Sequence, residues 1–254
     1  MPNPLDEAKK VVEVIFDELG TAGITRGPCP YVDGKDAIEW MFDKGYPSYT
    51  ELEWPGYYIK HLTQDLCKTE YPGKIEPYSI KKQHMVKGKY LWDIRLRSLA
   101  AESNDVILFD TENQNSLLDE HNGLGLIIYE AVMNYDIDDE FREWLLEFKG
   151  GLSDYEKQRE EEGRPVRLRK TGFMIVLAYA FHFTKDEFLK GVEDGWLRND
   201  FQLSMRNALG QPRNPKYLLH LDKVPKEYCL FVRNFNSDRE EFKSDFGDPD
   251  WGHI

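Results

Sequence analysis

Hydrophobic residues recur at helical spacing in four segments of this chain. Residues 5–19 carry an apolar position at every third or fourth step, and Gly20 ends that run. The same spacing predicts further helices over 36–44, 56–68 and 138–149. A highly charged helix capped by Ser153 is expected over 153–163, and another helix over 185–192. For the helix over 138–149, Asp138 is the expected N-cap and Gly150 the expected stop.

Runs of large apolar residues predict strands between these helices. The run 89–98 is followed by a turn-like segment and then by 106–109, so these two runs are expected to pair as a hairpin. Strands are also predicted at 123–129 and 228–232, whereas 171–183 suits a buried strand or a helix. The mix indicates an α/β or α+β fold, with a mixed central sheet flanked by helices. We expect one domain over 1–236 and an acidic tail over 237–254.

Composition indicates a globular protein with a sizeable core. Of its 254 residues, 41% are hydrophobic and 31% charged. No window approaches the roughly 20 consecutive apolar residues of a membrane span. The cysteines Cys29, Cys67 and Cys229 form no CxxC pair, which favours reduced thiols over a disulfide framework or a zinc site. The N-terminus lacks the basic segment and apolar core of a secretory signal, so a cytoplasmic location is expected.

The formal net charge of −13 argues against non-specific binding to nucleic acid, which depends on positive potential. Basic residues nevertheless gather in two segments, 81–97 and 164–170. Each run alone is typical of a solvated face. Together, two basic clusters in an acidic protein are a candidate phosphate-binding surface.

The clearest chemical signal lies in the run 89–98, KYLWDIRLRS. Residues i and i+2 of a strand point to the same face, so Asp93 and Arg95 share one side while the apolar residues between them fill the other. Glu76 is the candidate second carboxylate. Two carboxylates at strand ends can hold Mg²⁺, which polarises a phosphate and activates water, while a nearby cation stabilises the developing charge. The alternative interpretation is an ordinary strand with an exposed ion pair.

Glu76, the gap after it and Asp93-Ile94-Arg95 resemble the motif of the restriction-endonuclease-like superfamily, PD-(D/E)XK. That motif is an acid, a gap and (D/E)-x-K on an apolar strand, and the resemblance covers about the central half of the chain. It implies that Glu76 and Asp93 bind Mg²⁺ and that Arg95 contacts the scissile phosphate. Arg95 departs from the motif, because an arginine stays protonated and cannot transfer a proton as a lysine can.

The resemblance also implies a DNA-binding surface and an assembly. In such proteins a helix precedes the nuclease strands, and a basic segment after the sheet meets DNA. Contacts to the DNA backbone supply affinity without sequence choice. The residues expected to make them here are Lys81, Lys82, Arg97, Arg164, Arg167, Arg169 and Lys170. Restriction enzymes of this size usually act as homodimers on two-fold-symmetric sites.

Two further acidic motifs compete with this site. Asp110-Thr111-Glu112 follows the run 106–109, and Glu112 would be a reserve carboxylate if that strand pairs with 89–98. The alternative interpretation of this motif is a polar strand end that enters a loop. Glu147-Phe148-Lys149 matches (D/E)-x-K literally, but it lies within the capped amphipathic helix predicted over 138–149, so we reject it as a site.

Pro28-Cys29-Pro30 introduces another class. It resembles the haem-thiolate peroxidases, whose Pro-Cys-Pro supplies the axial ligand, and Glu120-His121-Asn122 would stand for their acid–base residues. The helix that follows the cysteine in that family is replaced by YVDGK. The alternative is a rigid surface loop with a buried thiol.

The sequence therefore predicts a cytoplasmic, Mg²⁺-dependent DNA endonuclease of type II restriction-enzyme character, acting on double-stranded DNA. The second interpretation is a non-catalytic DNA-binding or defence-associated protein on the same scaffold, favoured by Arg95 and the negative net charge. A haem-thiolate peroxidase-like enzyme comes third.

Overall fold

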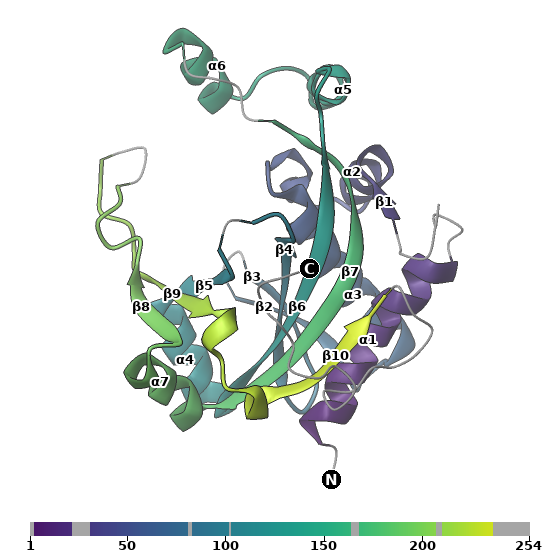
Figure 1. The fold of residues 1–254 in the computed structure, drawn as a ribbon. Coiled ribbons are helices and arrows are strands. Elements are labelled where there is room, and N and C mark those ends of the chain that lie inside the picture. Colours follow the sequence, from purple (N-terminus) through teal and green to yellow (C-terminus); the bar gives the residue numbers. More distant parts are fainter. Residues whose placement is uncertain are drawn as a thin grey trace.

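The computed structural model describes residues 3–21, 31–80, 83–101, 103–163, 168–206 and 210–235. Within them, helices flank a mixed sheet (Figure 1), and the predicted α/β class is confirmed. The helices are α1 (Pro4–Thr21), α2 (Gly34–Asp43), α3 (Trp54–Glu70), α4 (Thr111–His121), α5 (Glu140–Lys149), α6 (Asp154–Glu161) and α7 (Lys185–Asp194), with short 3₁₀ helices η1 (Pro47–Thr50), η2 (Leu221–Lys223) and η3 (Lys226–Tyr228). The strands are β1 (Tyr31–Asp33), β2 (Glu76–Ile80), β3 (Gln83–Lys87), β4 (Leu91–Ser98), β5 (Asp105–Asp110), β6 (Gly123–Tyr135), β7 (Lys170–Thr184), β8 (Leu197–Phe201), β9 (Lys216–His220) and β10 (Cys229–Asn234).

These strands form two sheets. The larger has the order β1-β7-β6-β4-β3-β2, and β10 also pairs with β7. Within it, β4 and β6 are parallel, whereas the other neighbours are antiparallel. The smaller sheet has the order β5-β9-β8. The predicted hairpin between 89–98 and 106–109 is therefore wrong, because β4 is bonded to β3 and β6 at its two edges and β5 pairs with the distant strand β9.

Alternation along the central strands separates two hydrophobic cores. Ile127 and Tyr129 of β6 pack with α1, α2 and α3, whereas Leu126 and Ile128 pack with the smaller sheet, α4 and α7. This is the two-residue period of a strand that is covered on both faces. The polar side chain of Asp93, in the first half of β4, is therefore fully buried.

The start of α5 differs from the prediction. Asp139, in the left-handed region with φ 64°, is the N-cap in place of Asp138, and it makes no side-chain capping bond. The carboxylate of Asp136 instead accepts hydrogen bonds from the backbone N of Phe141 and of Arg142, at 3.3 and 2.8 Å. The left-handed turn brings this earlier carboxylate to the free amides of the first turn. The predicted stop at Gly150 is confirmed.

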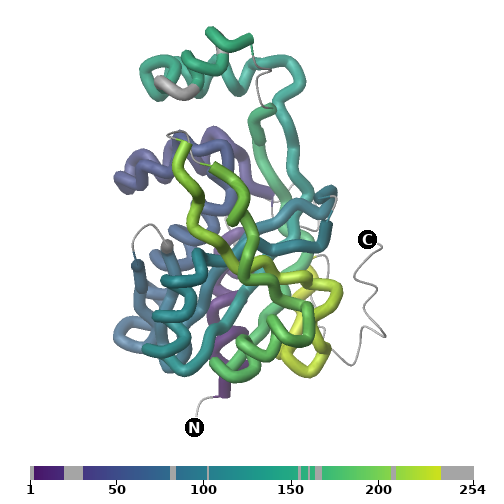
Figure 2. Tube along the Cα trace, turned by 90° about the vertical axis from the view of Figure 1, so that its left-hand side faces the viewer, coloured from purple at the N-terminus to yellow at the C-terminus, as the bar shows by residue number. Residues whose placement is uncertain are grey.

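The strands β6 and β7 form a long antiparallel pair, from Gly123 opposite Thr184 to Tyr135 opposite Lys170. Their far end carries α5 and α6 at one end of the molecule (Figures 1 and 2), where Phe148 of α5 packs edge-on against Phe42 of α2, with ring centroids 5.1 Å apart. The segment 171–183, which suited a strand or a helix, is thus a strand. The predicted tail over 237–254 lies outside the described residues.

Candidate functional site

The strand β4 places Asp93 and Arg95 side by side on the face toward the smaller sheet. Nε of Arg95 donates to Oδ2 of Asp93 over 2.7 Å, and Asp93 is fully buried. The prediction that they share one face is confirmed, and Ile94 between them packs into the opposite core. The pair is not the exposed ion pair of the alternative interpretation. Buried charges need further polar partners, so the surroundings of this pair matter.

A second cation, Lys60, reaches the same carboxylate from helix α3. Its Nζ lies 3.8 Å from Oδ1 of Asp93, and the residue is only 7% exposed. Pairing between β3 and β4 extends only as far as Met85 opposite Asp93. Gln64, one turn after Lys60, donates to the carbonyl oxygen of Met85 over 2.7 Å. The polar face of α3 therefore packs where the two strands part, and this packing brings Lys60 to Asp93.

Sequence reasoning missed Lys60 because it considered only one apolar stripe on this helix. A second buried row lies three, four and seven residues after Lys60, at Thr63, Gln64 and Cys67. These spacings place all four side chains on one helical face. The uncharged residues Thr63, Gln64 and Cys67 on this face could have indicated from the sequence that α3 is buried on two faces.

Two cations, Lys60 and Arg95, share the one buried carboxylate of Asp93, so the site carries more positive than negative charge. Burial and the positive charge of Arg95 lower the pKa of Lys60 to about 7, although the charge of Asp93 opposes the shift. Oδ1 of Asp93 and Nη2 of Arg95 are buried without a hydrogen-bond partner among the described residues. Native proteins rarely leave buried polar atoms in that condition unless water or a ligand satisfies them. The excess positive charge favours an anion.

A third cation, Lys216 of β9, lies where the smaller sheet meets β4. Cζ of Arg95 is 4.9 Å from the ring centroid of Phe109, and the next residue, Asp110, is opposite Lys216 in the pair of β5 and β9. Burial and the charges of Arg95 and Arg213 lower the pKa of Lys216, while Asp110 raises it. Residues from α3, β4, β5 and β9 thus gather here. We call them the Asp93 cluster: Lys60, Asp93, Arg95, Asp110 and Lys216.

The two glutamates predicted as metal ligand and reserve acid lie elsewhere. Glu76 is exposed at the start of β2, which β3 separates from β4, and its carboxylate accepts from the backbone N of Gly73 over 2.7 Å. Glu112 is exposed in the first turn of α4, where Asp110 is the N-cap. The segment 110–112 therefore starts a helix and does not enter a loop. Among the described residues, no group of three or more His, Cys, Asp or Glu side chains could hold a metal ion.

Three of the basic residues expected at DNA are paired with carboxylates of this chain: Arg97, Arg169 and Lys170. Arg97 forms an ion pair with Glu130 on β6 and donates to the carbonyl oxygen of Ser103 over 2.9 Å. Lys170 forms an ion pair with Glu53. Four others lie outside the described residues: Lys81, Lys82, Arg164 and Arg167.

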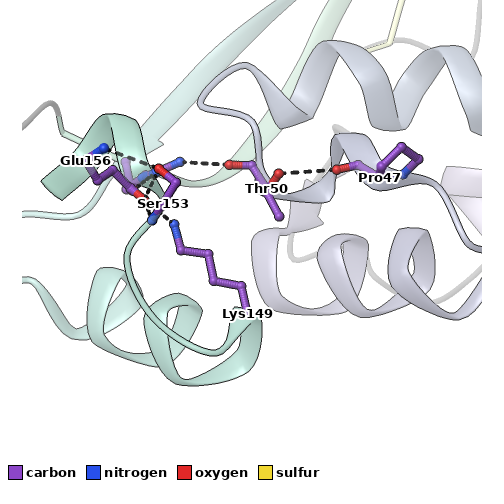
Figure 3. A network of polar contacts seen from close by, with 6 residues as sticks. Pro47, Thr50, Lys149, Ser153 and Glu156 are labelled. Carbon is purple, nitrogen blue, oxygen red and sulfur yellow. Dashed lines mark hydrogen bonds and ion pairs between the residues drawn. The ribbon is translucent and has the colours of Figure 1, made fainter. Parts of the chain in front are cut away.

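Arg169 belongs to a polar network that holds α6 near η1 (Figure 3). It donates to Oε1 of Glu156 over 2.5 Å, and Lys149 and Ser153 donate to Oε2 of the same carboxylate over 2.6 and 2.7 Å. Its other guanidinium nitrogen reaches the carbonyl oxygen of Thr50 at 3.5 Å. Burial raises the pKa of Glu156, but the hydrogen bonds from Lys149 and Ser153 outweigh this effect, and the resulting pKa is about 2. Arg169 is therefore engaged in joining two parts of the chain.

Only part of the peroxidase-like pattern falls within the described residues, because Cys29 lies outside them. Glu120 and His121 end helix α4, with Nε2 of His121 at 3.2 Å from Oε1 of Glu120. The ring of His121 meets that of Tyr78 edge-on, with centroids 5.4 Å apart. The haem interpretation stays a prediction.

Comparisons with known proteins identify no relative: no family model, curated protein or solved structure matches this chain. None of the helices in the described part of the chain is both long and apolar enough to cross a membrane.

Proposed function

We propose that this protein binds double-stranded DNA and hydrolyses its phosphodiester bonds at the Asp93 cluster. The observation that carries the proposal is the meeting of Lys60 and Arg95 at one buried carboxylate. The motif resemblance left an arginine where a lysine is expected, and helix α3 supplies a lysine to the same aspartate. A helix before the strands, as α3 stands before β2, also agrees with that resemblance.

The cations of the cluster suit a phosphate. Preorganised donors in a water-poor site stabilise the negative charge that develops as a phosphodiester reacts. Within the described part of the chain, the buried Nη2 of Arg95 has no hydrogen-bond partner and can donate to a phosphate, and Lys216 adds positive charge nearby. Asp93 holds Nε of Arg95 and so orients the guanidinium.

Lys60 suits proton transfer at neutral pH. A pKa of about 7 leaves a large share of this amine neutral there, and acid–base groups act best near the working pH. In the proposed step a water oxygen attacks phosphorus and its proton passes to Nζ of Lys60. The bond from phosphorus to the leaving sugar oxygen breaks, and that oxygen takes a proton from solvent.

The donor set does not fit a magnesium site as the described residues stand. Mg²⁺ takes oxygen ligands, but among the described residues the carboxylate of Asp93 is already shared by Lys60 and Arg95, and Asp110, the second carboxylate of the cluster, lies opposite Lys216. Glu76 and Glu112 lie on other elements. The proposed step therefore uses no metal ion, and the magnesium requirement stays a prediction to be measured.

Binding without cleavage is the second candidate. It is favoured by the single carboxylate between Lys60 and Arg95 and by the arginine at the motif's lysine position. For either candidate, the resemblance to restriction enzymes leads us to propose a cytoplasmic homodimer acting on two-fold-symmetric sites.

The test is incubation of the purified protein with plasmid and phage DNA, with Mg²⁺ or with EDTA. Cleavage that Lys60→Met and Asp93→Asn abolish, and that Lys190→Met preserves, would support the proposal; Lys190 is exposed on α7 and pairs with Asp194. Binding without cleavage would favour the second candidate. Neither binding nor cleavage, on modified and unmodified DNA alike, would refute both.

A further inference from the structure

The strands β8 and β9 continue beyond the smaller sheet as a projecting arm (Figures 1 and 2). We call residues 198–206 and 210–216 the hairpin arm. Backbone hydrogen bonds within the arm hold its described residues together. The backbone N of Arg213 donates to the carbonyl oxygen of Met205 over 2.9 Å, and Arg206 and Pro212 form an isolated antiparallel β-bridge. The described residues of the arm therefore form a two-stranded projection.

Its charge is opposite to that of the chain. The arm carries four basic residues and one acidic residue, whereas the whole protein has a net charge of −13. Arg198 is paired with Asp200, with 3.0 Å between Nη2 and Oδ1. Arg206 and Arg213 donate to the carbonyl oxygens of Gly210 and Arg206, at 2.8 and 3.3 Å. Those bonds leave their positive charge without a carboxylate partner among the described residues.

The base of the arm adjoins the Asp93 cluster. Lys216 is opposite Phe201 on one side and Asp110 on the other, and the neighbour of Asp110, Phe109, lies under the guanidinium of Arg95. The charge of Arg213 contributes to the lowered pKa of Lys216, behind burial and Arg95. Lys216 thus lies between the positive charge of Arg95 in the cluster and that of Arg213 on the arm, and both lower its pKa.

The arm also exposes apolar side chains. Leu203 is 59% and Met205 46% exposed, and their backbone N atoms donate to the carbonyl oxygens of Asp200 and Gln202 over 3.1 and 2.9 Å. A two-stranded ribbon fits the major groove of B-DNA, where apolar side chains contact the methyl group of thymine. Basic residues that border such a ribbon face the phosphates on either side.

We infer that the hairpin arm lies along duplex DNA next to the phosphate held at the Asp93 cluster. Arg206 and Arg213 contact backbone phosphates there, and Leu203 and Met205 face the groove. This inference rests on the proposed function, because it takes the same DNA as its ligand. It adds a contact surface that the sequence analysis did not include.

The test measures DNA affinity against salt concentration for the full chain and a double variant, Arg206→Gln with Arg213→Gln. Each lost phosphate contact makes the logarithmic slope shallower by about 0.9, so the double variant should lose about 2 from its slope. The matched control, Arg198→Gln, removes a charge that is already paired on the same arm and should leave the slope unchanged. Arg206→Lys with Arg213→Lys keeps both charges and should keep the slope.

The outcomes separate this inference from the proposed function. If the wild-type chain binds duplex DNA and the glutamine variant keeps its slope, the arm is not in contact with phosphates and the inference falls alone. Equal losses in the lysine and glutamine variants would mean that hydrogen bonding within the arm, and not charge, matters, which also overturns it. If the wild-type chain binds no duplex DNA, the proposed function falls and the inference with it. A wild-type preference for single-stranded DNA or RNA over duplex would overturn the groove contact.

Discussion

Gly125 of β6 lies directly opposite Trp92 of β4, and the indole ring occupies the space where a side chain on Gly125 would stand. A Cβ built on Gly125 would lie 2.1 Å from Cε3 of Trp92. The ring is fully buried against α1 and α3. Because protein interiors are closely packed, it has no free volume to move into. The close approach of β4 to β6 behind the Asp93 cluster therefore depends on the absence of a side chain at position 125.

Gly125→Ala should lower the free energy of unfolding by about 2 to 3 kcal/mol, the usual cost of overpacking a core. Urea denaturation measures it. Gly56→Ala is the matched control, because the space around Gly56 in α3 is open and the change should be neutral or stabilising by up to about 1 kcal/mol. Adding Trp92→Leu to Gly125→Ala should restore part of the loss. A Gly125→Ala protein as stable as wild type would show that the ring moves at no cost.

Glu7 of α1 anchors the turn that precedes β4. Its carboxylate accepts hydrogen bonds from the backbone N of Lys89 and of Tyr90, both at 3.0 Å, and from Nε1 of Trp92 at 2.9 Å. Removing an acceptor from buried donors costs about 1 to 3 kcal/mol for each group, so Glu7→Ala should destabilise the protein by about 3 kcal/mol. Glu7→Gln keeps one acceptor oxygen and should cost less. Thermal unfolding compares both with Glu39→Ala, a change at an exposed position of α2 that should have almost no effect.

Features that depend on neighbours in the sequence were predictable. The shared face of Asp93 and Arg95 follows from the two-residue period of a single strand, and α1, α3 and α7 follow from apolar spacing within one segment. Helix α4 was missed because its eleven residues bury only Gln114, Leu117 and Leu118, too few to mark a period.

Features that depend on distant segments were not predictable in this way. The partner of β5 is β9, more than a hundred residues later, and nothing within 105–110 indicates that choice. Lys60 likewise reaches Asp93 because α3 packs where the pairing of β3 with β4 ends. That position exists only once the sheet has formed. The prediction therefore found the two members of the Asp93 cluster that lie on one strand, Asp93 and Arg95, and paired them with Glu76, which lies on another part of the sheet.

The lowered pKa of Lys60 should appear as a pH dependence of stability. Between about pH 7 and the ordinary lysine pKa of 10.5, the unfolded chain holds a proton on Lys60 that the native chain lacks. The free energy of unfolding should therefore rise with pH in this window, by about 2 kcal/mol relative to Lys60→Met between pH 7 and 9. Parallel urea titrations of the two proteins measure the difference. His61 and His84 beside it also have lowered pKa values, so they stay neutral throughout this window.

The same ionisation should affect DNA binding in the opposite direction. An ammonium at Lys60 attracts phosphate, so raising the pH from 6 to 9 should weaken binding and make the salt slope shallower by about 1. Lys60→Met should show the shallower slope at both pH values. A wild-type slope that stays constant across this range would mean that Lys60 does not face the bound phosphate. If cleavage occurs, its rate should instead rise as the pH passes 7, since the neutral amine accepts the proton.

Glu156 should stabilise the position of helix α6 only above acidic pH. Its native pKa of about 2 lies below the ordinary 4.5, so its contribution is complete above pH 4.5 and is lost as the pH falls toward 2. At pH 7, Glu156→Gln should weaken α6 by about 1 kcal/mol, as expected for a partly exposed ion-pair network. Faster amide hydrogen exchange over residues 156–161 would measure the loss, and the difference from wild type should shrink toward pH 2. The control is Glu147→Gln, at an exposed position of α5 and within the rejected (D/E)-x-K match. It should change neither the exchange rates nor any cleavage of DNA, and an inactive Glu147→Gln protein would reinstate that motif as a candidate site.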